Sequence, residues 1–373
     1  MKNSVKKLNR CICCNSNNLN ETLNLGDLPL ANEYKSSPSQ EWDKYPLVLN
    51  TCMKCFHSQL SVAVNPDILF KNYCYVSGTS NTLKNFFNSF AKRFTDKFPD
   101  KKTVLDIACN DGSQLDAFKK YGWKTYGVDP AENIVSKITK HEVVNDYWQH
   151  ATFNERFDLI VAQNVFAHTS DLDGFLKNCL IHMKEDSVIL IQTSQCKMFQ
   201  SGQFDTIYHE HISFFNTNSM KELLKRYGLY INNISVEDIH GKSYLFEISK
   251  KESYVEPLGF EQCLFDKDFY KQYKIKCETI RSKFIKDNVE YGIGSAAKGM
   301  TFLGYCGSSL KYIFDENPNK IGLYCPYSKY PIKDLSESKK YFGNCVILAW
   351  NFYKELIAKS NSKGLKHKVY FDV

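Results

Sequence analysis

The stretch Lys102-Thr103-Val104-Leu105-Asp106-Ile107-Ala108-Cys109-Asn110-Asp111-Gly112-Ser113 decides the fold. It starts as a short apolar strand, turns at Cys109, and is followed by helical periodicity over residues 114–121. A second apolar strand, residues 123–129, ends in an acid, and residues 157–162 and 187–192 read as two further strands. Strands that alternate with helices predict an α/β fold built on a doubly wound parallel sheet.

The turn after the first strand has the layout of a nucleoside-binding site. Backbone amides at the turn and helix start can approach a ligand, and the acid that ends the next strand can accept hydrogen bonds from ribose hydroxyls. The turn has one glycine and so lacks the G-x-G-x-x-G fingerprint that seats a pyrophosphate. A cofactor without phosphate fits better, and S-adenosylmethionine (AdoMet) is the obvious one, the alternative being an unspecialised turn. The predicted cofactor-binding residues are Asp106, Ala108, Asn110, Gly112, Asp129, Pro130 and Asn164.

Two thiol pairs near the N-terminus predict a metal site. Cys11-x-x-Cys14 and Cys52-x-x-Cys55 have the spacing that grips tetrahedral zinc. Four thiolates leave no position for water, so this zinc is expected to be structural rather than catalytic. Cys13 could compete as a ligand, but Cys14 restores the two-residue gap. The alternative is a small unit with buried cysteines.

Bulk composition excludes several classes of protein. The chain has 373 residues, 43% hydrophobic and 24% charged, as in ordinary globular proteins. No apolar run approaches the roughly 20 residues that span a bilayer, and no apolar segment follows the basic first residues, so neither a membrane span nor a secretory signal is expected. The 14 cysteines without a secretory signal favour a reducing compartment, and we expect a cytoplasmic monomer. The net charge of +7 is spread along the chain and selects no partner.

The tetrapeptide Tyr208-His209-Glu210-His211 gathers acid–base side chains between apolar and aromatic neighbours. That composition suits a general base with a nearby charge and a hydroxyl donor. If the segment is extended, residues two apart share a face, so His209 and His211 could both face a site. A metal-binding His-x-His or a packed polar turn is the alternative.

The C-terminal third reads as a second, smaller α/β unit. A helix is predicted over residues 260–287, and further strands over residues 311–315 and 345–350. Between them, Tyr291-Gly292-Ile293-Gly294-Ser295-Ala296-Ala297-Lys298-Gly299 follows a strand-to-helix pattern. Amides and an ammonium at that helix start would suit a phosphate, although Lys298 could equally be a solvated surface lysine.

Several motifs follow one another along the chain, and their order and spacing together are distinctive. They are Cys11-x-x-Cys14, Leu25-Gly26-Asp27-Leu28-Pro29-Leu30-Ala31-Asn32, Tyr45-Pro46-Leu47, Cys52-x-x-Cys55, Tyr73-Cys74-Tyr75-Val76-Ser77-Gly78-Thr79-Ser80, Asn110-Asp111-Gly112, Asn164-Val165-Phe166-Ala167-His168, Phe204-Asp205-Thr206-Ile207-Tyr208-His209-Glu210-His211, Ala296-Ala297-Lys298-Gly299, Asp315-Glu316-Asn317-Pro318-Asn319-Lys320 and Ala349-Trp350-Asn351. With them the chain resembles the AdoMet-dependent C-methyltransferases that act on nucleotide-linked deoxysugars and have an N-terminal zinc domain.

The resemblance implies three domains: a zinc-binding domain at 1–72, a Rossmann-like AdoMet methyltransferase domain at 73–250, and a C-terminal α/β domain at 251–373. It implies methyl transfer to a sugar carbon, usually C3, next to a keto group at C4. The implied catalytic residues are His211, Tyr208, Glu210, His168 and Tyr75. The implied contacts to the nucleotide-diphosphate sugar are Tyr75, Ser80, His209, Lys298, Asn317 and Lys320.

The chemistry of such a transfer suggests roles for these residues. A C–H bond beside a ketone ionises if a base lies near the hydrogen and donors lie near the oxygen. His211 is the expected base, because histidine titrates near neutral pH. Glu210 is expected to orient an imidazole or raise its basicity. Tyr208 or His168 would donate to the developing enolate oxygen.

Three positions depart from the family pattern. Ala108 stands where a small residue, often glycine, is usual, and Gln192 replaces an acid common at the end of its strand. Residues 326–331 replace a Pro-Gly-Thr-like turn, which leaves the nucleotide and the sugar open. An O- or N-methyltransferase on the same sugars and a non-catalytic paralogue are alternatives. A zinc-containing nucleic-acid methyltransferase is another, although the basic residues form no stripe and neither a nucleic acid nor a membrane is the expected partner.

Overall fold

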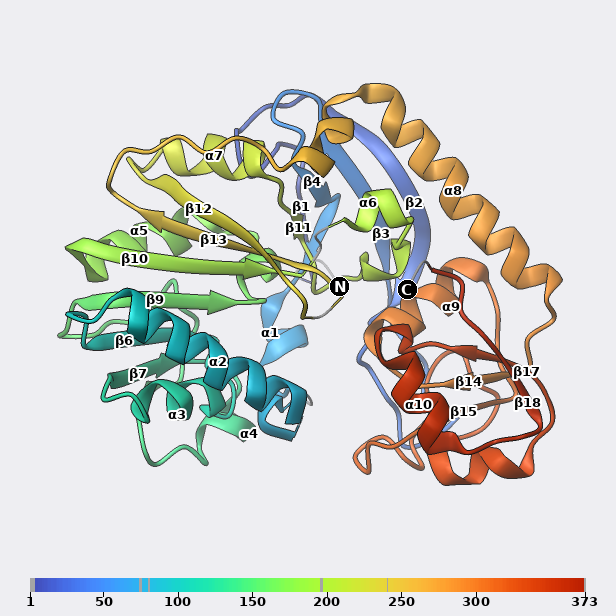
Figure 1. The fold of residues 1–373 in the computed structure, drawn as a ribbon. Coiled ribbons are helices and arrows are strands. Elements are labelled where there is room, and N and C mark those ends of the chain that lie inside the picture. The colour runs from blue at the N-terminus through green and yellow to red at the C-terminus, as the bar shows by residue number, and fades with distance from the viewer. Residues whose placement is uncertain (1–3, 74–75, 80, 195–196, 240, 372–373) are drawn as a thin grey trace.

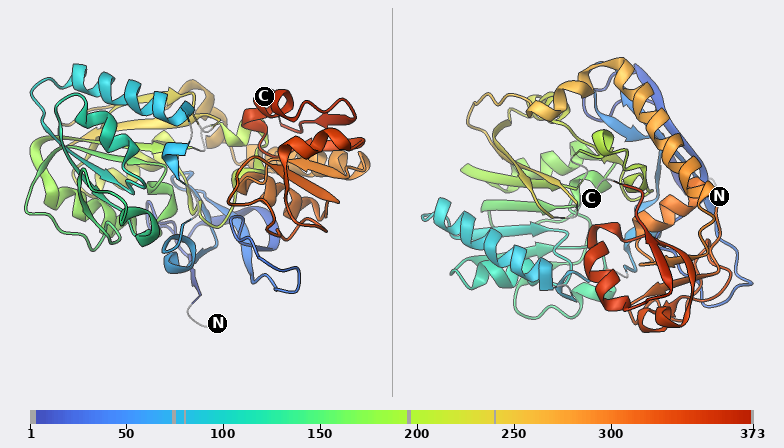
Figure 2. Two further views of the ribbon diagram at one scale, coloured as in Figure 1. Left: turned by 90° about the horizontal axis from the view of Figure 1, so that it is seen from below. Right: turned by 45° about the vertical axis from the view of Figure 1, so that its right-hand side comes forward.

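A computed structural model describes residues 4–73, 76–79, 81–194, 197–239 and 241–371. Three units surround a common centre (Figure 1): a large mixed sheet with its helices, an N-terminal unit built on long strands, and a C-terminal unit with its own sheet. The long helix α8(Lys267–Lys286) runs along the outside of the molecule, beside the strands of the N-terminal unit (Figure 2). Within the described residues, no helix is both long and apolar enough to cross a membrane.

The large sheet has seven strands in the order β12-β13-β10-β9-β6-β7-β8. Five of them are parallel, and β13 runs antiparallel to both β10 and β12. The α/β fold is therefore confirmed, and the four strands predicted from the sequence, β6, β7, β9 and β10, are parallel to one another. The sheet continues beyond β10 with a hairpin, β12–β13, that was not predicted. The strands are β6(Thr103–Ile107), β7(Lys124–Val128), β8(Glu142–Val144), β9(Phe157–Gln163), β10(Met183–Thr193), β12(Tyr230–Glu237) and β13(Ser243–Ser249).

Helices cover both faces of this sheet because its strands are apolar on both sides. Successive side chains of a strand point to opposite faces. Val104 accordingly packs with α2(Asn81–Lys97) and α3(Ser113–Lys119) on one face. Leu105 packs with α5(Leu172–His182) and α7(Thr217–Lys225) on the other. The short α4(Glu132–Val135) follows β7.

The N-terminal unit is tied to the rest of the chain by a strand from the middle of the sequence. Its antiparallel sheet has the order β11-β4-β3-β2, in which β11(Ser213–Phe214) follows the Tyr208–His211 tetrapeptide after one intervening residue. The remaining elements of this unit are β1(Val5–Lys7), β2(Leu19–Pro29), β3(Lys44–Cys52), β4(Ser58–Leu60), β5(Val62–Val64) and α1(Pro66–Phe70).

The C-terminal unit repeats the plan of strand, turn, helix and acid. Its parallel sheet has the order β16-β15-β14-β17-β18. The strands are β14(Tyr291–Ile293), β15(Tyr312–Asp315), β16(Lys333–Asp334), β17(Gly343–Ile347) and β18(Leu365–Lys368), and the helices are α9(Ala297–Cys306) and α10(Tyr353–Ser360). Apolar side chains of β2, α8 and α9 share one core, so this unit is packed against the N-terminal strands.

Candidate active site

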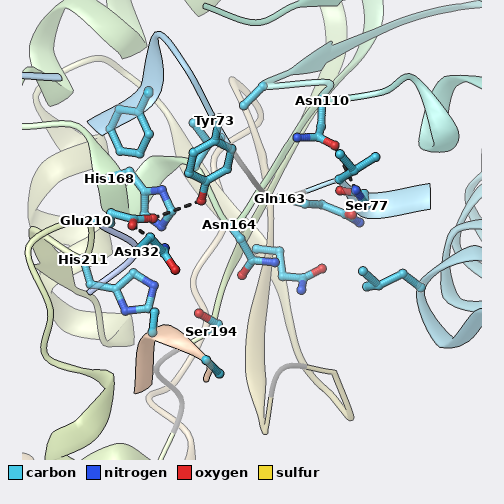
Figure 3. A pocket seen from close by; sticks show the side chains of 18 of the residues that line it. Asn32, Tyr73, Ser77, Asn110, Gln163, Asn164, His168, Ser194, Glu210 and His211 are labelled. Carbon is cyan, nitrogen blue, oxygen red and sulfur yellow. Dashed lines mark hydrogen bonds between the residues drawn. The ribbon is translucent and has the colours of Figure 1, made fainter. Parts of the chain in front are cut away.

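One cavity of about 1710 Å³ lies where the three units meet. It is lined by the turn after β6, by residues from the Tyr208–His211 tetrapeptide, and by the loops after β14 and β15. Figure 3 shows Ser77 and Asn110 on one side of it, and His168, Glu210 and His211 on the other. A cavity of this size can hold two substrates side by side.

The turn after β6 is built around Asp129, which directly follows β7. One carboxylate oxygen of Asp129 accepts from the Asn110 amide at 2.9 Å, and the other accepts from the Ala131 amide at 2.8 Å. Ala108 and Asn110 have φ values of 59° and 51°, so two non-glycine residues adopt the left-handed conformation here. Pro130 also lines the cavity beside Asp129. Such strained backbone persists where the surrounding structure holds it, and it clusters at ligand sites.

The charges of this turn fit AdoMet. Asp106 is 5% exposed, and its carboxylate accepts no hydrogen bond from the part of the chain that is described. Burial, and then the charges of Asp129 and Asp111, hold the pKa of Asp106 well above its usual range. A cationic ligand would relieve that cost, and AdoMet carries both an ammonium and a sulfonium.

Gly112 was predicted to bind the cofactor, but it lies outside the cavity lining. It precedes the first residue of α3 with φ +78°. A Cβ at this position would lie 3.3 Å from the His141 ring. The glycine therefore serves the turn and its packing rather than direct contact with a ligand in the cavity.

The ring of His211 is fixed in one tautomer by the backbone. Its Nδ1 lies 2.7 Å from the carbonyl oxygen of Thr206, which can only accept, so Nδ1 carries the proton. In the neutral ring Nε2 then has no hydrogen and can accept one. The ring is 3% exposed, lines the cavity, and lies 4.0 Å from the Tyr208 ring between centroids.

Glu210 does not contact either histidine of the tetrapeptide through a hydrogen bond among the described residues. Its Oε1 accepts from Asn32 Nδ2 at 2.6 Å, and its Oε2 accepts from the Tyr73 hydroxyl at 3.0 Å (Figure 3). Burial raises the pKa of Glu210, and these two donors oppose the shift. The expectation that Glu210 orients an imidazole directly has no support in these contacts. Its charge can still act on the cavity that it lines.

The two other histidines lie in different places. His168 lines the cavity, its ring 5.1 Å from that of His211, and its Nε2 has no hydrogen-bond partner among the described residues. His209 points away, with Nε2 3.2 Å from the Tyr45 carbonyl oxygen, and does not line the cavity. The segment is a turn closed by the His211 amide on the Tyr208 carbonyl, so it is not the extended segment in which His209 and His211 would share a face.

Burial lowers the pKa of His168 and of His209 to about 4. Both rings are therefore neutral at physiological pH.

Sequence reasoning missed Asn32 and Tyr73 as functional candidates. Both stand in motifs that carry the family resemblance, which was the available signal. Their contacts to Glu210 span 178 and 137 residues of sequence, a separation that no local pattern reveals. The predicted Tyr75 and Ser80 lie outside the described residues.

Lys298 lies in the first turn of α9 and lines the cavity. Its ammonium lies 5.0 Å from the Trp350 ring centroid, and burial lowers its pKa while the charge of Asp205 opposes that shift. Asp205 accepts from Trp350 Nε1 at 2.6 Å, and burial raises its pKa to about 6. Lys298 is thus half-buried and lines the cavity, rather than being a fully solvated surface lysine.

The loop after β15 completes this side of the cavity. Asp315 accepts from the Ser295 amide at 2.6 Å and from the Asn317 amide at 2.8 Å, which joins the two loops. Lys320 donates to the Ser295 carbonyl at 2.9 Å. Gly294 has φ +87°, and a Cβ there would lie 2.6 Å from that of Ala349, so glycine is required. Asn164, predicted for the cofactor, also lines the cavity, with φ 53°.

The four predicted zinc ligands come together. The sulfur atoms of Cys11, Cys14, Cys52 and Cys55 all lie within 4.8 Å of one another, and Cys13 is not in the group. The Cys11–Cys55 sulfur distance is 3.5 Å and the Cys14–Cys52 distance is 3.6 Å. Tetrahedral Zn–S bonds of about 2.3 Å require sulfurs about 3.8 Å apart, so the site fits a structural zinc.

Three family models match successive parts of the chain. A zinc binding domain matches residues 11–70, a methyltransferase domain matches residues 81–233, and a C-methyltransferase C-terminal domain matches residues 261–369. C-methyltransferase NovU of Streptomyces niveus is 23% identical over 96% of this chain and 93% of that protein. A ubiquinone biosynthesis O-methyltransferase of Rhodopseudomonas palustris (strain BisB5) is 29% identical over 24% of this chain and 39% of its own length.

Solved structures resemble the chain more distantly. The PH0226 protein from Pyrococcus horikoshii OT3 has a TM-score of 0.38 at 16% identity and covers 48% of this chain and 95% of its own. The glycopeptide N-methyltransferase MtfA has a TM-score of 0.37 at 13% identity and covers 44% of this chain and 90% of its own.

The order of the three domains, the likeness to NovU over nearly the whole length and the four-cysteine site agree with the AdoMet turn described above. The chain belongs to the AdoMet-dependent C-methyltransferases that carry an N-terminal zinc-binding domain and a C-methyltransferase C-terminal domain.

Proposed function

We propose that this C-methyltransferase methylates a sugar carbon, C3, beside the 4-keto group of a nucleotide-diphosphate-linked deoxysugar. One observation carries the proposal: the Thr206 carbonyl holds the proton of His211 on Nδ1, which leaves Nε2 as an acceptor in a cavity shared by two ligand-binding loops. AdoMet, when bound, supplies the electrophilic methyl group. The residues of the protein must then convert the sugar carbon into a nucleophile.

His211 is the base in this proposal. Its Nε2 takes the hydrogen of the carbon beside the ketone as a proton, and the electron pair of that bond moves toward the ketone oxygen as an enolate. General bases of this kind contribute about 10²–10⁴-fold. The nearby charge of Glu210 favours the imidazolium that results, because an opposite charge stabilises the protonated ring.

His168 is the candidate donor for the enolate oxygen. Its ring is neutral, it is stacked on Phe70 at 5.8 Å, and it lies on the same side of the cavity as His211. A neutral imidazole carries one N–H, which can donate to a developing negative oxygen in a site shielded from water. Tyr208 and Tyr75 remain proposals for the same region.

The C-terminal loops are proposed to hold the nucleotide diphosphate. The amino end of α9 and the Lys298 ammonium are the features that favour a phosphate. Asn317 and Lys320 line the same part of the cavity. His209, once a candidate contact, packs against Tyr45 and has no part in the proposal.

The direct test is product analysis with AdoMet labelled with ¹³C in its methyl group. A set of thymidine, guanosine and cytidine diphosphate 4-keto sugars is incubated with the zinc-loaded enzyme, and the products are examined by NMR. The expected product has the labelled methyl on carbon and loses the C3 hydrogen. A labelled methyl on oxygen or nitrogen, or no transfer to any nucleotide sugar, would refute the proposal.

A further inference from the structure

The end of β10 carries a buried amide with nothing to bind. Gln192 is fully buried and lines the cavity, yet neither its Oε1 nor its Nε2 has a hydrogen-bond partner among the described residues. A buried amide left without partners is costly, and buried polar groups in folded proteins are nearly always satisfied. The missing partner is therefore expected to come from a ligand.

A second amide lies beside it. Gln163 ends β9, lines the cavity, and is paired in register with Gln192, so the two side chains leave the same face of the sheet. The Nε2 of Gln163 also has no partner among the residues described. The backbones are joined there, because the Asn164 amide donates to the Gln192 carbonyl at 3.0 Å.

The two glutamines lie on strands other than the one that leads into the AdoMet turn. Along the edge of the sheet the order is β10, β9, β6, and the AdoMet turn follows β6. Neighbouring strands are about 4.8 Å apart, which puts Gln192 about 10 Å from that turn. Figure 3 shows Gln163 and Asn164 between Asn110 on one side and His168 and His211 on the other. Gln192, on β10, lies one strand further from the AdoMet turn than Gln163.

We infer that Gln192, with Gln163 beside it, recognises a neutral hydroxyl group of the acceptor sugar in preference to an ammonium group. The inference rests on the proposed function and specifies its substrate class. An amide both donates and accepts, and a hydroxyl does the same, so the pair satisfies both. An ammonium only donates, which leaves the amide N–H groups unpaired. A carboxylate at this position would have the opposite preference.

The test uses three nucleotide 4-keto sugars that differ only at C3, which carries a hydroxyl group, an amino group or only hydrogen. For each, kcat/KM is measured with wild type, Gln192→Glu and Gln192→Met. We expect wild type to prefer the hydroxyl sugar. Gln192→Glu should shift the hydroxyl-to-amino ratio toward the amino sugar by at least about tenfold. Gln192→Met should lower the preference for hydroxyl over hydrogen by a similar factor.

Gln40→Glu is the matched control, since Gln40 is exposed and does not line the cavity. It should keep the wild-type ratios. Calorimetric binding of S-adenosylhomocysteine shows that each variant is folded. If wild type transfers methyl to a sugar but both Gln192 variants keep its ratios, the inference is wrong and the proposed function stands. If wild type methylates none of the sugars, the proposed function fails, and this inference fails with it.

Discussion

Glu210 is held by two donors from distant parts of the chain, and its ionisation depends on them. Tyr73→Phe removes the donor to Oε2. Because burial already raises the pKa of Glu210, losing a donor should raise it further. If the ionised carboxylate supports His211, the acidic limb of the kcat/KM profile should move upward by about one pH unit.

The matched control is Tyr227→Phe, because the Tyr227 hydroxyl also donates to a carboxylate, Asp173, but outside the cavity. That variant should keep the wild-type limb. An unchanged limb in Tyr73→Phe would show that ionisation of Glu210 does not limit the reaction.

The burial of His209 leads to a separate prediction, which concerns how the free energy of unfolding depends on pH. Its pKa is lowered from 6.5 to about 4 in the folded protein, so the unfolded chain binds a proton that the folded chain excludes. The stabilising contribution is therefore complete above pH 6.5 and is lost as the pH falls toward 4. Between pH 6.5 and pH 5 the loss amounts to about 1.5 kcal/mol.

Urea unfolding at these two pH values, with zinc saturating, measures that loss. The variant His209→Gln keeps a donor for the Tyr45 carbonyl but cannot titrate. On acidification it should therefore lose less unfolding free energy than wild type, by the amount that His209 contributes. His150→Gln changes an exposed ring and should lose as much stability as wild type. Equal losses in His209→Gln and wild type would contradict the assignment.

At the scale of elements, the pairing of β11 with β4 links the metal site to the Tyr208–His211 tetrapeptide. Ser213 pairs with Gln59, and Phe214 pairs with Ser58, close in sequence to Cys52 and Cys55. The Leu60 amide also donates to the Ile212 carbonyl at 2.9 Å. Zinc can thus stabilise the strand that follows His211 without contacting the substrate.

Zinc removal should therefore impair catalysis more than cofactor binding. After chelation, amides of β4 and β11 should exchange hydrogen faster, and kcat should fall by at least about tenfold. Amides of β6 and β7 should serve as the internal control, and the affinity for S-adenosylhomocysteine should stay within about threefold. Unchanged exchange in β4 and β11 would show that the metal does not support this pairing.

Elements with local signals could be predicted from the sequence, and elements fixed by distant pairing could not. The apolar strand that becomes β6 and the acid that directly follows β7 could be predicted from pattern and spacing. The two Cys-x-x-Cys pairs likewise predicted the sulfur cluster. The two residues of β11 are too few to carry a pattern, and their partner strand lies far away in the sequence. The strand β13 was not predicted, because a short apolar run cannot be told from a buried helical segment by its periodicity alone.

At the scale of the whole molecule, the cavity joins three units that contribute different chemistry. Lys298 from the C-terminal unit should carry part of the affinity for the diphosphate, because hydrogen bonds to charged groups contribute about 1.5–3 kcal/mol. Lys298→Met should therefore weaken binding of a nucleoside diphosphate by at least about tenfold in calorimetry, with AdoMet binding unchanged.

Lys311→Met provides the control for that measurement. Lys311 is exposed and precedes β15, at the end of the sheet opposite to the loops that line the cavity. It should leave nucleotide affinity as in wild type. Equal weakening in both variants would mean that general positive charge, rather than the site at α9, attracts the nucleotide.

The central claim is that His211 removes a proton from carbon before the methyl group is transferred. Incubating the enzyme with its nucleotide 4-keto sugar in D₂O, without AdoMet, and following the C3 hydrogen by NMR or mass spectrometry tests this claim most directly. We predict enzyme-dependent exchange of deuterium into C3 in wild type and a loss of at least about 10²-fold in His211→Asn. Exchange in His211→Asn at the wild-type rate would contradict the account.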